Sequence, residues 1–379
     1  MLSPTPLCLF CALLLCLPLA VIITITSPTT TVHDGSGHNL VPDLDPPPKT
    51  QQRFSSKPLP LPLHDDDSLF RVASRVKSKL PPGSPKKIAF LFLTISPLPF
   101  APLWELYFNQ TPKDLFNVYV HADPSYPYDP PFSGVFAHRV IPSKPALRFT
   151  PTLASAARRL LAHALLHDRS NYMFVLLSAS CIPIHSFDFT YKTLTRSKKS
   201  FIEILNNEVG SYDRWAARGK DSMLPEVTLE NFRIGSQFWS LTRKHAKLVV
   251  GDKVIWAKFN QPCVVWDTCY PEENYFPTLI HMRDPRGAVP ATLTHVDWNG
   301  SFDGHPRMYV ESEIGPQLIS RLRKDKPRYG DDGTNGSDSP VTKQRRGFPF
   351  LFARKFSPES IQPLLRIANA VVFKDEANL

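Results

Sequence analysis

The chain has 379 residues, 42% of them hydrophobic, which is enough for a sizeable packed core in one large or two smaller domains. Its 39 prolines are concentrated early in the sequence, which indicates a stiff linker and excludes a wholly disordered protein. The formal net charge of +10 favours an anionic partner: nucleic acid, a membrane surface or a phosphorylated small molecule.

The first predicted element is a membrane-spanning helix. Residues 7–25 form an uncharged apolar run, which at about 1.5 Å per residue is long enough to cross a bilayer. A cleaved signal peptide is the alternative, but it would require a shorter apolar core and small residues at a cleavage site. After the run, several aspartates but no Lys or Arg precede Lys49. We therefore predict a cytoplasmic tail at residues 1–6, a single-pass type II signal anchor at 7–25, and a lumenal remainder.

Residues 26–85 have the composition of an extended stem. Pro-rich polar stretches such as KPLPLPLHDDD stay extended and bury little surface. A short helix is expected near the end of the stem, over residues 68–79. The folded lumenal domain is expected to span residues 86–379.

The sequence pattern changes at Ile88, where predicted buried strands begin to alternate with predicted helices. A continuous apolar run such as IAFLFLTI is typical of a strand buried on both faces. Strands are expected at 88–95, 116–123, 135–141 and 172–180, and helices at 102–108 and 152–167. This alternation predicts an α/β fold with a mostly parallel sheet, whose ligands bind outside the carboxyl ends of the strands. His121, Asp123, Ser178 and Ser180 are expected at that rim.

The second half mixes shorter elements. A strand leading into a helix is expected over 238–250, a helix over 273–282 and a strand over 292–298. A basic loop at 321–347 precedes a strand over 348–356 and a helix over 358–368. Cys263 and Cys269 are close enough in sequence to bridge a short loop, which would leave Cys181 unpaired; three reduced, buried thiols are the alternative.

Charged residues in the second half suggest chemistry without a metal. No DxD pair, the carboxylate motif that holds a divalent metal against a diphosphate, follows a predicted strand, since the acidic pairs at 43–45 and 65–67 lie in the stem. If the protein handles a nucleoside diphosphate, Lys and Arg must neutralise it, so no metal or cofactor is expected. Glu272 and Glu273 begin the helix expected at 273–282, where an acid either caps the helix or serves as a general base beside aromatic residues.

Seven blocks of sequence, in order, resemble the plant core-2/I-branching β-1,6-N-acetylglucosaminyltransferase-like family, which is similar to glycosyltransferase family 14. The blocks are KIAFLFLT, YVHADP, FVLLSASCIPI, RIGSQFWSLTRKHA, CYPEENYFPTL, THVDWNG..DGHPR and FLFARKFSPES. The resemblance implies a variant GT-A fold (a Rossmann-like mixed sheet flanked by helices) and a type II Golgi membrane protein. It also implies inverting, metal-independent transfer of a sugar, here N-acetylglucosamine, from a UDP-sugar donor to a hydroxyl of a glycan or glycoprotein acceptor.

The resemblance also implies site residues. Glu273 matches the catalytic base, and Lys355 a lysine that binds the donor diphosphate. The diphosphate-binding arginine maps to Arg307, with Arg321 or Arg323 as alternatives. Trp298 and Arg214 match acceptor-binding positions. Arg354, beside Lys355, is expected to point toward water.

Three departures from the plant pattern bear on activity. Ala179 stands where the pattern has Glu, Asn274 stands where it has His, and Phe348 and Pro349 occupy the region of a missing Cys. A catalytically degenerate member that binds a glycan or protein partner is therefore the alternative to an active enzyme. A nucleic-acid binder would use the basic loop, but the predicted membrane anchor argues against it. In the lumen, Asn109 and Asn335 are candidate glycosylation sites, whereas Asn299, next to Trp298, is expected to be unmodified.

Overall fold

The structure is a computed structural model that describes residues 65–109, 111–301, 305–330 and 347–375. The expected membrane helix, most of the expected stem and the sequon at Asn335 lie outside these ranges. Within them, no helix combines the length and apolarity needed to cross a membrane. All the elements below belong to one unit, residues 57–379.

The main sheet has six strands in the order β2-β1-β3-β6-β5-β7. Strand β1 is parallel to both β2 and β3, whereas β6 is antiparallel to its neighbours. A second sheet has the order β4-β9-β8. The strands are β1 (Lys87–Thr94), β2 (Phe116–Ala122), β3 (Asn171–Ser178), β4 (Ile182–Pro183), β5 (Ser200–Phe201), β6 (Ser240–Thr242), β7 (Ala288–Val289), β8 (Thr294–Val296) and β9 (Phe352–Arg354).

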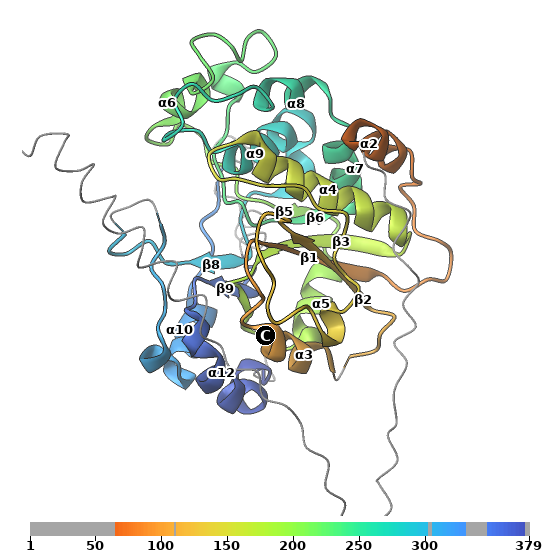
Figure 1. Cartoon of the computed structure of the whole chain (residues 1–379), viewed down its shortest axis with the longest axis vertical. Coiled ribbons are helices and arrows are strands. Elements are labelled where there is room, and N and C mark those ends of the chain that lie inside the picture. The colour runs from red at the N-terminus through yellow and green to blue at the C-terminus, as the bar shows by residue number, and fades with distance from the viewer. Residues whose placement is uncertain (1–64, 110, 302–304, 331–346, 376–379) are drawn as a thin grey trace, which may run out of the picture. The chain divides into compact units, whose positions relative to one another are not determined.

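Helices cover both faces of the main sheet (Figure 1). The helices are α2 (Asp66–Ser74), α3 (Ala101–Asn109), α4 (Pro151–His167), α5 (Phe187–Arg196), α6 (Ser211–Ala216), α7 (Arg243–Gly251), α8 (Val254–Phe259), α9 (Pro271–Arg283), α10 (Pro316–Lys324) and α12 (Ile361–Ile367), which continues as a π-helix (Ala368–Val372). The expected mostly parallel α/β sheet is thus a mixed sheet, in which β2, β1 and β3 are parallel and β6 is antiparallel to its neighbours.

The two faces follow from alternation along the central strands. Ala89 and Leu91 of β1 face the core shared with α2, α4, α7 and α9. Phe90 and Phe92 face the opposite core, shared with α3 and α5. Because every second residue points to the same face, a strand that is apolar throughout must be covered on both sides.

The strand expected at 135–141 is wrong. Val135 and Phe136 are buried in a 3-10 turn (Gly134–Phe136), and only Val140 forms a bridge, to Val120 of β2. His138 has a φ of 59°, a left-handed conformation that breaks the extended run. A short apolar run cannot by itself distinguish a buried turn from a buried strand.

Helix α2 belongs to the folded unit, although residues 66–74 fall within the expected stem. Its residues Leu69 and Phe70 are buried in the core shared with α4 and α7. The Arg158 guanidinium from α4 lies between the rings of Phe70 and Trp256, 4.4 and 4.3 Å from their centroids. This cation–π contact ties the helix to the domain.

Candidate active site

A cavity of about 1070 Å³ opens at the carboxyl ends of β1 and β3 and extends between them, α9 and the smaller sheet. Its lining includes four of the predicted site residues: Arg214, Glu273, Trp298 and Lys355. The rule for ligand sites in α/β sheets predicts this position. The sequence prediction therefore converges on one cavity, from elements far apart along the chain.

Glu273 is held in place yet open to the cavity. It lies in the first turn of α9, after Pro271. Its carboxylate accepts a 2.9 Å hydrogen bond from Arg214, and its side chain is 28% exposed. Arg214 is fixed in turn, because its guanidinium lies 4.4 Å from the centroid of the Tyr270 ring. The carboxylate thus has a defined orientation and can reach a bound molecule.

Gly235 holds the wall of the cavity close to this carboxylate. Its N–H donates a 2.9 Å hydrogen bond to the backbone carbonyl of Glu273. A Cβ at this position would lie 2.1 Å from the backbone oxygen of Glu203. Only glycine allows the two backbones to approach so closely.

Two further carboxyl groups line the cavity, and burial changes their acidity. Burial raises the pKa of Glu272 to about 8, helped by the negative charge of Glu273. Burial also raises the pKa of Glu203 to about 7. Glu203 follows the two-residue strand β5, which is too short to produce a pattern in the sequence, so sequence reasoning does not single it out.

Trp298 lies on the loop after β8, and its side chain is 57% exposed. Asp297 fixes this loop, since its carboxylate accepts a 3.0 Å hydrogen bond from the backbone N–H of Asn299. An exposed indole on a cavity wall provides a flat apolar surface of the kind on which sugar rings stack.

Lys355 and Arg354 both line the cavity. The expectation that Arg354 points toward water is wrong: its guanidinium lies over the ring of Phe238, 4.6 Å from the centroid, and burial lowers the pKa of the group. The preceding strand β9 pairs with β8 and β4, which fixes the backbone that carries Arg354. Two adjacent cations therefore face the cavity that also holds Glu273.

Arg307 does not line the cavity, although His305 and Pro306 do. Its guanidinium is paired with Glu313 and lies 3.7 Å from Asp297. Arg307 is thus committed to two carboxylates of the chain itself, and it is absent from the cavity lining that contains Lys355.

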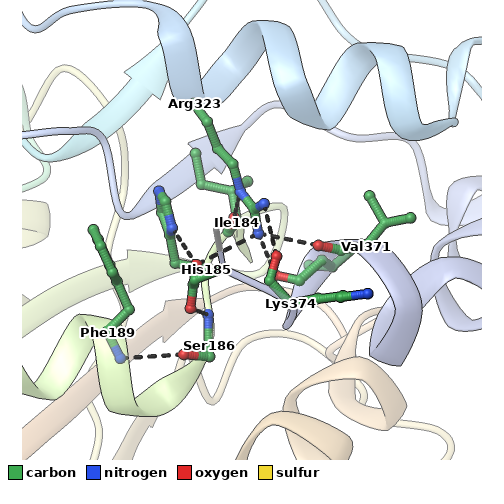
Figure 2. Close-up of polar contacts among 9 residues, drawn as sticks. Ile184, His185, Ser186, Phe189, Arg323, Val371 and Lys374 are labelled. Atoms are coloured by element: carbon green, nitrogen blue, oxygen red, sulfur yellow. Dashed lines mark hydrogen bonds and ion pairs between the residues drawn. The ribbon is translucent and has the colours of Figure 1, made fainter. Parts of the chain in front are cut away.

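Arg323, one alternative to Arg307, is a structural residue (Figure 2). Its guanidinium donates hydrogen bonds of 2.6–3.1 Å to four backbone carbonyls, those of Ile184, Val371, Val372 and Lys374. Arg321, the other alternative, is exposed on α10 and does not line the cavity. Arg323 therefore fastens the C-terminal segment to the loop after β4.

Replacing Arg323 with Met is expected to lower the free energy of unfolding by about 2–4 kcal/mol, because four backbone carbonyls lose a charged donor. Replacing the exposed Arg321 with Met should change it by less than about 0.5 kcal/mol. Urea unfolding followed by circular dichroism measures both values. Equal effects of the two substitutions would contradict this role for Arg323.

The expected rim residues separate into two groups. Ser178 and Ser180 line the cavity. His121 and Asp123 are buried away from it, and the Asp123 carboxylate accepts backbone hydrogen bonds from Ser125 at 2.8 Å and Ala146 at 2.7 Å. Asp123 thus holds the loop that carries Ala146, and Ala146 itself lines the cavity.

Two of the three departures from the plant pattern, Ala179 and Asn274, fall at and beside the cavity, whereas Phe348 packs against the ring of Phe201. Ala179 lines the cavity, so a glutamate there would add a carboxyl group next to the two cations. Asn274 is fully buried, and neither of its amide atoms has a hydrogen-bond partner among the described residues. Such a residue carries a desolvation cost.

The remaining predicted positions lie outside the cavity. Cys263 and Cys269 are joined in a disulfide with a Cα–Cα distance of 6.2 Å, and Cys181 is buried with a free thiol. Asn109 is exposed at the end of α3. In the part of the chain that the structure describes, no group of three or more His, Cys, Asp or Glu side chains is arranged to hold a metal ion.

A mixed α/β sheet flanked by helices, with a carboxylate and cations facing one cavity at the strand ends, fits a GT-A-like glycosyltransferase. Comparison with known proteins gives the family. The model of the Core-2/I-Branching enzyme family matches residues 88–323, and the chain belongs to this family. It is also 30% identical to Glycosyltransferase BC10 of Oryza sativa subsp. japonica over 319 residues, 74% of this chain and 76% of that protein. The protein is therefore a glycosyltransferase.

Proposed function

We propose that this glycosyltransferase inverts the anomeric centre and needs no metal, moving a sugar from a UDP-sugar to a glycan hydroxyl. The observation that supports this most is that Glu273 and Lys355 line the same cavity. A carboxylate base and a cation on the leaving group are the two parts that such a displacement requires. We further propose a variant GT-A fold, N-acetylglucosamine as the donor sugar, and a type II location in the Golgi membrane, as the family resemblance implies.

In this mechanism Glu273 removes the proton from an acceptor hydroxyl, and the resulting oxygen attacks the anomeric carbon. The bond between that carbon and the β-phosphate oxygen breaks on the opposite face, so the configuration inverts. UDP leaves with its charge next to Lys355. With an effective dielectric constant of about 20, unit charges about 4 Å apart attract by about 4 kcal/mol before desolvation. Arg214 orients the base, and Trp298 offers a stacking surface for the acceptor.

The test is turnover of a panel of UDP-sugars by the purified full-length chain in detergent, with and without EDTA. We expect turnover to persist in EDTA at an unchanged rate, and the product linkage, read by NMR, to have the anomeric configuration opposite to that of the donor. Complete dependence on Mn²⁺ would contradict the metal-free mechanism. Retention of configuration would contradict direct displacement by the acceptor.

A catalytically degenerate member remains the second candidate, because Ala179 lines the cavity and the buried Asn274 side chain has no hydrogen-bond partner within the described part of the chain. In that case the chain would bind UDP or a glycan, but no donor in the panel would turn over. Restoring the family residues with Ala179→Glu and Asn274→His would then raise turnover from the background.

A further inference from the structure

Arg354 lines the cavity and has no ion-pair partner among the residues that the structure describes. Its Nε is buried and makes no hydrogen bond, and among the described residues no carboxylate lies within ion-pair distance of its guanidinium. Its one close contact of known geometry is with the ring of Phe238. An arginine carries five N–H donors and stays protonated in proteins, so this group brings both a charge and unused donors to the site.

Such an arrangement is costly in a folded protein. Buried charges are normally paired, because removing an ion from water without compensation destabilises the native state. Other arginines of this chain have acceptors: the buried Arg158, Arg218 and Arg243 donate hydrogen bonds to backbone carbonyls, and the partly exposed Arg214 pairs with Glu273. Among the described residues, Arg354 has neither kind of partner. Because Arg354 lacks such a partner and lines a large cavity, we infer that its charge is neutralised by an anionic group of a bound ligand.

The surroundings of Arg354 identify the chemistry of that anion. Lys355, the next residue, lines the same cavity, and so does Arg148. Burial lowers the pKa of Arg354, the negative charge of Glu273 raises it, and the positive charge of Arg148 lowers it. Three cations around one space suit a ligand with more than one negative charge. The planar guanidinium also matches the paired oxygens of a phosphate group.

We propose that Arg354, together with Lys355, binds the diphosphate of the nucleotide donor, in the role that the family resemblance implies for Arg307. This inference rests on the proposed function, since it requires a nucleoside diphosphate sugar as substrate. It also accounts for the order of residues in FARKF, in which an apolar strand carries two consecutive cations to the edge of the cavity.

The experiment compares binding of UDP and of uridine to the full-length chain by calorimetry in EDTA. For Arg354→Gln we expect UDP to bind about 10–100-fold more weakly, with uridine binding unchanged. Arg354→Lys keeps the charge but not the planar pair of donors, so its loss should be smaller. Arg366→Gln, an exposed arginine on α12, is the matched control and should bind UDP as the wild type does.

Thermal unfolding gives a second readout that distinguishes ligand binding from a structural role. Removing an unpaired cation should leave the ligand-free Arg354→Gln protein as stable as the wild type or more so, while the rise in Tm on adding UDP shrinks. A ligand-free protein that is strongly destabilised in both Arg354 variants would overturn the proposal.

The same measurements also distinguish failure of this inference from failure of the proposed function. If Arg354→Gln keeps the wild-type preference for UDP over uridine but changes only the KM for acceptor, the residue serves the acceptor side and the inference is wrong. If the wild-type chain binds no nucleoside diphosphate, the proposed function fails instead.

Discussion

Replacing Glu273 with Gln is expected to lower kcat by about 10²–10⁴-fold, the usual contribution of a positioned general base. The amide keeps the size of the carboxylate but cannot take a proton from the acceptor hydroxyl. The protein should still fold, because Glu273 is partly exposed and its side chain has one ion-pair partner, Arg214. UDP binding should be preserved, since Lys355 and Arg354 are unchanged.

The matched control is Glu311→Gln, which removes an exposed carboxylate that does not line the cavity. Steady-state kinetics on purified variants, with circular dichroism as a check on folding, measures the difference. Wild-type turnover by the Glu273→Gln protein would show that another group accepts the proton. Glu203 and Glu272, which line the same cavity, would then be the first candidates.

The sequence predicted best the elements with long, uniform patterns. Apolar runs located β1, β2 and β3, and helical spacing of apolar residues located α4 and α9 to within two residues. Short elements were less predictable: the strand expected at 348–356 is confined to Phe352–Arg354. Where a segment is only a few residues long, tertiary contacts decide its conformation and local pattern carries little information.

At the candidate site, too, some features could be predicted from the sequence and others could not. Glu273, Trp298, Arg214 and Lys355 could be placed from family resemblance, and they do share a cavity. The environment of each side chain could not be predicted, because burial and ion pairing depend on how the folded chain orients each side chain, even between residues close in sequence. Arg307 is occupied by Glu313, six residues away along the chain, whereas Arg354 points inward onto Phe238.

We expect the ionisation of Glu272 and Glu203 to lower the free energy of unfolding as the pH rises from about 4.5 to about 8. Burial raises the pKa of Glu272 to about 8 and that of Glu203 to about 7, from 4.5 in the unfolded chain. Between these values the native state holds protons that the unfolded state has released, so the free energy of unfolding decreases with pH. The decrease is about 4 kcal/mol for Glu272, and smaller for Glu203, whose pKa is raised less.

The double variant Glu203→Gln, Glu272→Gln isolates this contribution, because an amide does not titrate. Other groups act in the opposite direction: burial lowers the pKa of His121 and His163 to about 4, so their contribution to stability is lost as the pH falls below about 6.5.

The informative quantity is therefore the difference in Tm between wild type and double variant, measured from pH 5 to 9. The variant should gain stability relative to wild type as the pH rises, and the difference should level off above pH 8. A difference that is independent of pH would mean that both carboxyl groups are already ionised in the folded protein, and that the cavity around Glu273 contains three negative charges facing its cations.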